Sequence, residues 1–155
     1  MSVISYRAAT LIDCHFVGNN LRQGDRDEVA ALGKTPVDSI VGGYVYGDTC
    51  MVGTVDDEPI LIYGRVPVLK GPRVGAIWML GTDKMYTYRF SVLRDSRPKL
   101  AELFHGYDML CNHVDSRNEL HIQWLRWLGF SFLRKTTAIS VDGTPFYEFA
   151  KVNHV

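Results

Sequence analysis

Two carboxylates and two histidines are the side chains of this sequence best suited to moving a proton. Asp25 and Glu28 are three residues apart in an acidic stretch, while His113 and His121 belong to the C-terminal part of the chain. A carboxylate or an imidazole can accept a proton from a reacting group when its pKa lies near the working pH. Each group also has a structural interpretation, because carboxylates stabilise the first turn of a helix and half-buried histidines are common. Asp25, Glu28, His113 and His121 are therefore candidate catalytic residues, and both interpretations stay open.

The three cysteines show no pattern typical of a metal site or of a disulfide framework. Cys14, Cys50 and Cys111 are scattered, with no CxxC motif and no Cys/His cluster. We expect three reduced and mostly buried thiols, and no bound metal. A catalytic cysteine is an alternative, because His15 and His113 are close to two of the thiols in sequence.

Composition indicates one folded domain over residues 1–155 with no electrostatic bias. Of 155 residues, 46% are hydrophobic and 22% are charged, and 17 basic residues balance 17 acidic ones. A net charge of zero gives no general attraction to nucleic acid or to anionic lipid, so we expect neither as a partner. The N-terminal residues lack a basic segment followed by an apolar run, and no stretch is apolar enough to cross a bilayer. We expect a protein that is neither secreted nor membrane-embedded.

The N-terminal half predicts a strand, then helices, then a hairpin. Residues 2–8 have strand character, and Thr10 with Asp13 forms the capping box of a first helix. The acidic stretch at 25–28 opens a second helix, and Thr35-Pro36 begins a third that runs to about residue 46. Two strands follow at 51–55 and 60–64 around a turn, and the apolar residues 74–80 predict a central strand.

The C-terminal half predicts two helices and three strands. Residues 81–93 are ambiguous, since Tyr86, Tyr88, Phe90 and Val92 alternate as in a strand. Ser96 and Pro98 predict the start of the next helix, which Gly106 ends. A strand at 108–114 precedes a helix at 118–128, whose apolar stripe includes Trp124 and Trp127 as core residues. Strands at 130–133 and 146–151 complete an α/β (α+β) fold, with helices on the faces of a mixed, mostly antiparallel sheet.

Several segments resemble proteins of the GNAT superfamily of N-acetyltransferases. The residues that carry this resemblance are Trp78-Met79-Leu80-Gly81-Thr82-Asp83, the stretches 90–94 and 112–115, the run 117–130 and the closing segment 142–146. The run from Arg117 to Phe130 is the most specific of them. It resembles GNAT-like proteins of tailed bacteriophages, including the internal head protein family of short-tailed coliphages.

The resemblance implies an acetyl-CoA slot beside residues 74–80. In the family this strand splays from its neighbour, and its backbone pairs with the pantetheine arm, so Trp78, Met79 and Leu80 are expected to border the slot. The loop after it binds the pyrophosphate, which makes Lys84 and Arg89 the candidate cations, although both are also ordinary surface residues. Asn118 matches the family asparagine that opens the last helix, and it is also a candidate N-cap.

Two departures from the family pattern favour a noncatalytic protein. The loop after Leu80 lacks the second glycine, and Leu125 stands where the family often has a proton-donating tyrosine. The favoured hypothesis is a phage-encoded protein of the host cytoplasm or the virion that acts by contacts with a host or virion protein. Its aromatic residues near 86–90 are the first candidates for an interface, and acetyl-CoA should not change its thermal stability. The alternatives are an N-acetyltransferase that moves an acetyl group from acetyl-CoA to an amine, and a regulator that binds a CoA-like ligand.

Overall fold

A computed structural model describes residues 2–68 and 73–154, and its centre is one seven-stranded sheet. The strands are β1 (Ser5–Ala8), β2 (Thr49–Val55), β3 (Glu58–Pro67), β4 (Val74–Gly81), β5 (Met109–Asp115), β6 (Ser131–Thr136) and β7 (Phe146–Val152). Their order across the sheet is β1-β2-β3-β4-β5-β7-β6, and every neighbouring pair is antiparallel except β4 and β5. The predicted mixed, mostly antiparallel sheet is confirmed.

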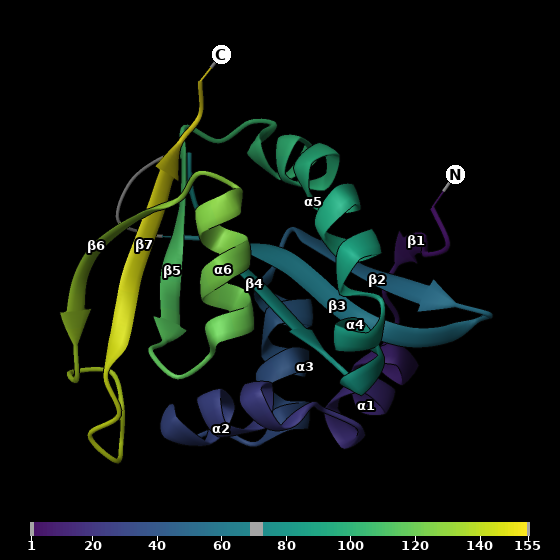
Figure 1. The fold of residues 1–155 in the computed structure, drawn as a ribbon, viewed down its shortest axis with the longest axis horizontal. Helices are drawn as coiled ribbons and strands as arrows, with labels where there is room; N and C mark the ends of the chain where they lie inside the picture. Colours follow the sequence, from purple (N-terminus) through teal and green to yellow (C-terminus); the bar gives the residue numbers. More distant parts are fainter. Residues whose placement is uncertain (1, 69–72, 155) are drawn as a thin grey trace.

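Helices cover both faces of this sheet (Figure 1). The helices are α1 (Leu11–Asn19), α2 (Gln23–Ala31), α3 (Pro36–Tyr46), α4 (Asp83–Thr87), α5 (Arg89–Phe104) and α6 (Glu119–Trp127). One apolar cluster packs α5 and α6 against one face, and a second packs α1, α2 and α3 against the other. None of these helices combines the length and apolar character needed to cross a bilayer.

Local sequence signals fix the starts of the first and third helices. The Thr10 side chain accepts from the Asp13 N–H while the Asp13 carboxylate accepts from the Thr10 N–H, as the capping box predicts. Thr35 caps α3 through the Asp38 N–H, with Pro36 in the first turn. The β2–β3 turn places Asp56 and Asp57 at φ values of 49° and 67°, a conformation that aspartate tolerates better than most residues.

The segment after β4 differs from the prediction. Residues 83–104 form two consecutive helices with no strand, and Pro98 lies inside α5 instead of in its first turn. A proline removes one backbone hydrogen bond from a helix interior, and burial offsets that loss here. Val92 lies before Pro98, and Leu100 and Leu103 lie after it, all buried against the sheet. Tyr86 and Phe90 are exposed, so their alternation does not reflect a strand face.

The stripe on α6 is narrower than predicted. Trp124 is buried in the core, but Trp127 is 39% exposed and packs under the Arg97 guanidinium at 4.0 Å. The prediction that both tryptophans are core residues is therefore wrong for Trp127. It lies at the helix end, where the stripe turns away from the sheet.

Candidate functional site

The sheet opens between β4 and β5. Only Val74, Gly75 and Ala76 of β4 pair with β5, opposite Met109, Leu110 and Cys111. Immediately afterwards the Asn112 amide donates to the Ile77 carbonyl at 2.7 Å, which marks the narrow end of the gap. The first turns of α2 bridge the wide end. Asp25 accepts from the Gly81 N–H at 2.9 Å, and Glu28 accepts from the Asp115 N–H at 2.7 Å.

A cavity of about 660 Å³ passes through this gap and reaches both faces of the sheet. Its middle is lined by Ile77, Trp78, Met79, Leu80, Asn112, His113 and Val114 of the two strands. On one side the lining comes from α2 and α3, including Glu28, Leu32, Asp38, Ser39 and Tyr46. On the other side it comes from α5 and α6, including Val92, Leu100, His121, Trp124 and Leu125. Tyr86, Tyr88 and Phe90 are not among the lining residues, so the gap is open and not plugged by aromatic side chains.

The backbone of Met79 points into this gap. Alternate residues of an antiparallel strand direct both their N–H and C=O groups to the same side. Gly81 directs both groups away from β3, since its N–H donates to Asp25 and its C=O accepts from the Arg22 N–H. Met79 lies two residues earlier and shares that orientation, and the β4–β5 ladder has already ended at Ala76. An extended ligand in the gap would therefore find one donor and one acceptor on Met79.

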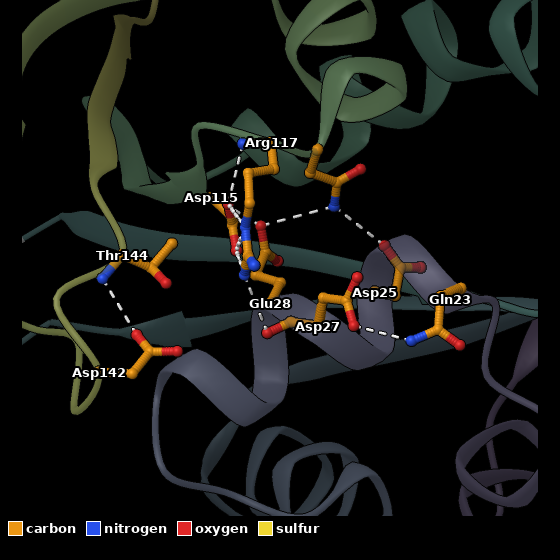
Figure 2. A network of polar contacts seen from close by, with 9 residues as sticks. Gln23, Asp25, Asp27, Glu28, Asp115, Arg117, Asp142 and Thr144 are labelled. Carbon is orange, nitrogen blue, oxygen red and sulfur yellow. Dashed lines mark hydrogen bonds and ion pairs between the residues drawn. The ribbon is translucent and has the colours of Figure 1, made fainter.

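A polar network joins α2 to the N-terminal end of α6 (Figure 2). Arg22 forms an ion pair with the buried Asp25 at 3.0 Å and donates to the Asn118 side-chain oxygen. The Asn118 amide donates to Asp25 at 3.1 Å and to Glu28 at 3.5 Å. Beside it, Asp115 is buried and holds Arg117 at 2.6 Å. These contacts fix the position of Glu28 at the edge of the cavity.

The environment of Glu28 makes it a weak acid suited to proton exchange near neutrality. Burial raises the pKa of its carboxyl from 4.5 to about 7, and the nearby Asp25 charge adds to that shift. The Asp115 N–H and the Asn118 amide oppose the shift by stabilising the carboxylate. Glu28 remains partly accessible through the cavity, so a ligand can reach it.

Both candidate histidines line the same cavity. Burial lowers the pKa of His121, with the Asp25 charge opposing and the Arg22 charge supporting that shift. Its Nε2 lies 3.4 Å from Asp25 Oδ1 and its ring stacks on Trp124. His113 lies on β5, with its Nε2 3.5 Å from Glu148. The fold thus brings Glu28, His113 and His121 to one cavity, and their catalytic roles stay predictions.

The residues predicted to bind the cofactor fall into two groups. Trp78, Met79 and Leu80 line the cavity, and Asn118 is buried in the polar network. Asn118 occupies the N-cap position of α6, but its side chain makes no capping hydrogen bond, so the N-cap hypothesis is wrong for that side chain. Lys84 instead pairs with Glu58 at 2.8 Å, and Arg89 packs between Tyr86 and Phe90, away from the cavity lining.

Three backbone N–H groups of the loop after β4 are already engaged within the protein. A cradle for a diphosphate requires free backbone N–H groups. The Gly81 N–H donates to Asp25, the Thr82 N–H to the Ile60 carbonyl, and the Lys84 N–H to the Thr82 hydroxyl. The α4 helix that follows is a single short turn. The gap therefore leaves room for an extended chain, whereas the N–H groups of Gly81, Thr82 and Lys84 are not available to a diphosphate.

Two residues of the site, Tyr63 and Arg22, were not anticipated from the sequence. Leu125, the aliphatic residue expected at the acid position, lines the cavity. Tyr63 of β3 also lines it, beside Met79, and burial raises the pKa of its hydroxyl, so the group stays protonated. Arg22 completes the polar network. A tyrosine in a buried strand and an arginine before a helix carry no sequence signal for either role.

Comparisons with solved structures identify the fold as that of the GNAT acetyltransferases. Ard1 from Thermoplasma volcanium superposes with a TM-score of 0.76 at 14% identity over 99% of each chain. AAC(6')-Ib in complex with ribostamycin and coenzyme A gives 0.69 at 13% identity over 96% of this chain and 93% of that one. A chimera of the spermidine N-acetyltransferase SpeG from Vibrio cholerae with hSSAT gives 0.72 at 14% over 97% and 96%. No family model matches the sequence, and no curated protein is similar to it.

Proposed function

We propose that this protein is an N-acetyltransferase that moves an acetyl group from acetyl-CoA to an amine. The observation that carries the proposal is the open cavity through the sheet, with Glu28 at its edge and the Met79 backbone inside it. A bound acetyl-CoA supplies the reactive thioester. Because the cavity reaches both faces of the sheet, acetyl-CoA and the amine can enter from opposite faces and meet within the gap. Sequence alone favoured a noncatalytic protein, and the open gap supports the enzymatic alternative instead.

Glu28 is the general base of this proposal. An ammonium group must lose a proton before its nitrogen can attack a thioester carbonyl. A carboxyl group with a pKa of about 7 is about half ionised at neutral pH, so it can accept that proton. Asn118 and the Asp115 N–H both donate to one oxygen of the Glu28 carboxylate. In this way they position the second oxygen of the same carboxylate.

The Met79 N–H orients the donor and stabilises negative charge on the thioester oxygen. A backbone donor fixed by the sheet needs no reorganisation when that charge develops. Around it, Leu80, Val92, Trp124 and Leu125 line the cavity with apolar surface, which excludes water from the reacting groups.

A tyrosine at position 125 is not required for the thiol to leave. A thiol has a pKa of about 8.5, so its thiolate is a competent leaving group near neutral pH. Tyr63 lines the cavity beside Met79, and its hydroxyl, whose pKa is raised by burial, can donate a hydrogen bond to the leaving thiolate while keeping its own proton. The replacement by Leu125 is therefore expected to slow the reaction without preventing it.

Substitution of Glu28 by glutamine tests the proposal. Glutamine keeps the acceptor for the Asp115 N–H but cannot take a proton, so Glu28→Gln should lower kcat with a primary amine by about 100-fold or more. The readout is release of the free thiol from acetyl-CoA, with polyamines, aminoglycosides and peptide N-termini as acceptors. For the wild type, kcat/KM should rise with pH through about 7 as Glu28 ionises, and the variant should lose that step.

The matched control is Glu119→Gln, which changes an exposed glutamate in the first turn of α6. Its kcat should stay within about twofold of the wild type. Equal rates for Glu28→Gln and the wild type would rule out Glu28 as the base. No thiol release with any amine would reject the proposed function itself.

A second candidate is a protein-contact function in a phage-encoded protein, with a host or virion partner. It is favoured by two exposed aromatic residues, Tyr86 and Phe90, which are 53% and 74% exposed and flank the Arg89 guanidinium. If this function alone is correct, Tyr86 and Phe90 matter to the partner and Glu28→Gln changes nothing that can be measured.

A further inference from the structure

A second pocket lies between the C-terminal half of α5, the end of α6 and the end of β7. It is lined by Arg97, His105, Trp127, Lys151 and His154, together with the apolar residues Leu100, Phe104 and Leu128. In Figure 1 these three element ends meet on the side of the sheet that carries α5 and α6. Neither the proposed base nor the gap in the sheet belongs to this pocket.

The lining of this pocket is basic, with no aspartate or glutamate among its described residues. Arg97 is exposed and packs on the Trp127 ring at 4.0 Å, and no hydrogen bond or ion pair engages it within residues 2–68 and 73–154. A guanidinium stacked on a ring still presents its N–H donors in its own plane. Lys151 donates to the Leu128 carbonyl at 2.7 Å, which places a second cation at the pocket wall. Arg97 and Trp127 thus offer phosphate recognition and an aromatic surface side by side.

The pocket adjoins the cavity through the sheet. Leu100 of α5 and Leu128 at the end of α6 line both. From His121 at the cavity to Leu128 the chain advances seven residues, which is about 10 Å along a helix. An extended arm between α5 and α6 could therefore join a group in the gap to a group in the basic pocket.

We propose that the basic pocket binds the phosphorylated adenosine end of the coenzyme A donor, in place of the loop after β4. This inference rests on the proposed function. The inference is supported by a contrast between the groups that the loop after β4 and the basic pocket offer to phosphate. The N–H groups of Gly81, Thr82 and Lys84 are engaged in internal hydrogen bonds and Lys84 is paired with Glu58. Arg97, by contrast, has no hydrogen-bond or ion-pair partner among the described residues, and it has an aromatic neighbour for the base.

Charge reversal at Arg97 tests the site directly. Arg97→Glu should weaken binding of adenosine 3′,5′-bisphosphate by about tenfold or more, measured by titration calorimetry at fixed ionic strength. The same change at Arg94, which is exposed on the same helix and lines neither pocket, is the matched control and should stay within about twofold. Lys84→Glu, in the loop after β4, should also stay within about twofold. Trp127→Leu should weaken binding by about fivefold or more.

A comparison of donors separates this site from the catalytic proposal. Arg97→Glu should raise KM for acetyl-CoA and leave KM for S-acetylpantetheine, which lacks the nucleotide, unchanged. Equal effects of Arg97→Glu and Arg94→Glu on bisphosphate binding, or a larger effect of Lys84→Glu, would overturn the assignment. So would an equal rise in KM for both donors. Binding of the bisphosphate at Arg97 without acetyl transfer to any amine would support the pocket and reject the proposed function.

Discussion

At the scale of single residues, the site depends on how α2 places carboxylates against two strand ends. Asp25 takes the Gly81 N–H and the Arg22 guanidinium, so its charge is compensated. Within residues 2–68 and 73–154 no ion pair engages Glu28, and burial raises the pKa of its carboxyl to about 7. The two acids are one helical turn apart and differ in role because only one of them is paired. That difference makes Glu28 the residue on which the chemistry depends.

The raised pKa of Glu28 predicts a pH-dependent stability difference. The folded protein holds a proton on Glu28 that the unfolded chain loses above about pH 4.5, so the free energy of unfolding falls as pH rises toward 7. Glu28→Gln does not titrate. The stability of this variant relative to the wild type should therefore rise between pH 4.5 and 7 and level off above 7, by about 3 kcal/mol in total. Urea unfolding of both proteins at pH 5 and pH 8 measures it, and a constant difference would contradict the raised pKa.

Part of this site is visible in the sequence, and the rest is hidden for a physical reason. The acidic stretch at 25–28 and the Asn118 position were visible because helix starts favour such residues. Arg22 and Tyr63 were not visible, since their roles arise from contacts across 96 residues with Asn118 and from strand pairing with Met79. Long-range contacts of this kind leave no local pattern.

At the scale of elements, α3 approaches the cavity through two adjacent glycines with different surroundings. A Cβ on Gly43 would lie 2.6 Å from the Trp78 ring, whereas a Cβ on Gly42 would meet nothing within 4 Å. Trp78 lines the cavity and lies over Gly43, so the close approach of this helix sets the shape of the cavity on the side of α2 and α3.

The two glycines predict opposite effects of alanine. Gly42→Ala should stabilise the protein by about 0.5–1 kcal/mol, because alanine loses less backbone entropy in a helix. Gly43→Ala should destabilise it by about 1–3 kcal/mol and displace Trp78. Thermal unfolding and the intrinsic fluorescence of both variants provide the measurement. Similar stabilities for the two variants would show that α3 does not pack on Trp78 as described.

Helix and strand signals located most elements but misplaced the start of α5. Caps at Thr10 and Thr35 and the turn at Asp56-Asp57 are local, and the structure confirms them. Ser96 and Pro98 also satisfy the local rule for a helix start, yet α5 begins at Arg89. The contacts of Val92 and Leu100 with the sheet decide that outcome, and a helix-start rule does not include them.

At the scale of the whole molecule, the cavity is a consequence of topology. A sheet with one parallel pair at its centre can separate there while its antiparallel parts stay intact, and α2 and Asn112 then bridge the two ends of the gap. The order of elements was predictable from the sequence, since periodicity gives helices and strands. The open state of the gap was not, because it depends on Tyr86 and Phe90 lying outside it.

Thermal unfolding in the presence of acetyl-CoA tests the central claim, that the gap between β4 and β5 holds an acyl-CoA donor. A ligand that binds only the folded state at 100 times its Kd stabilises it by about 2.7 kcal/mol. For a domain of this size that corresponds to a rise in Tm of roughly 5–10 °C. Saturating acetyl-CoA should produce such a rise. An unchanged Tm at millimolar acetyl-CoA would contradict it.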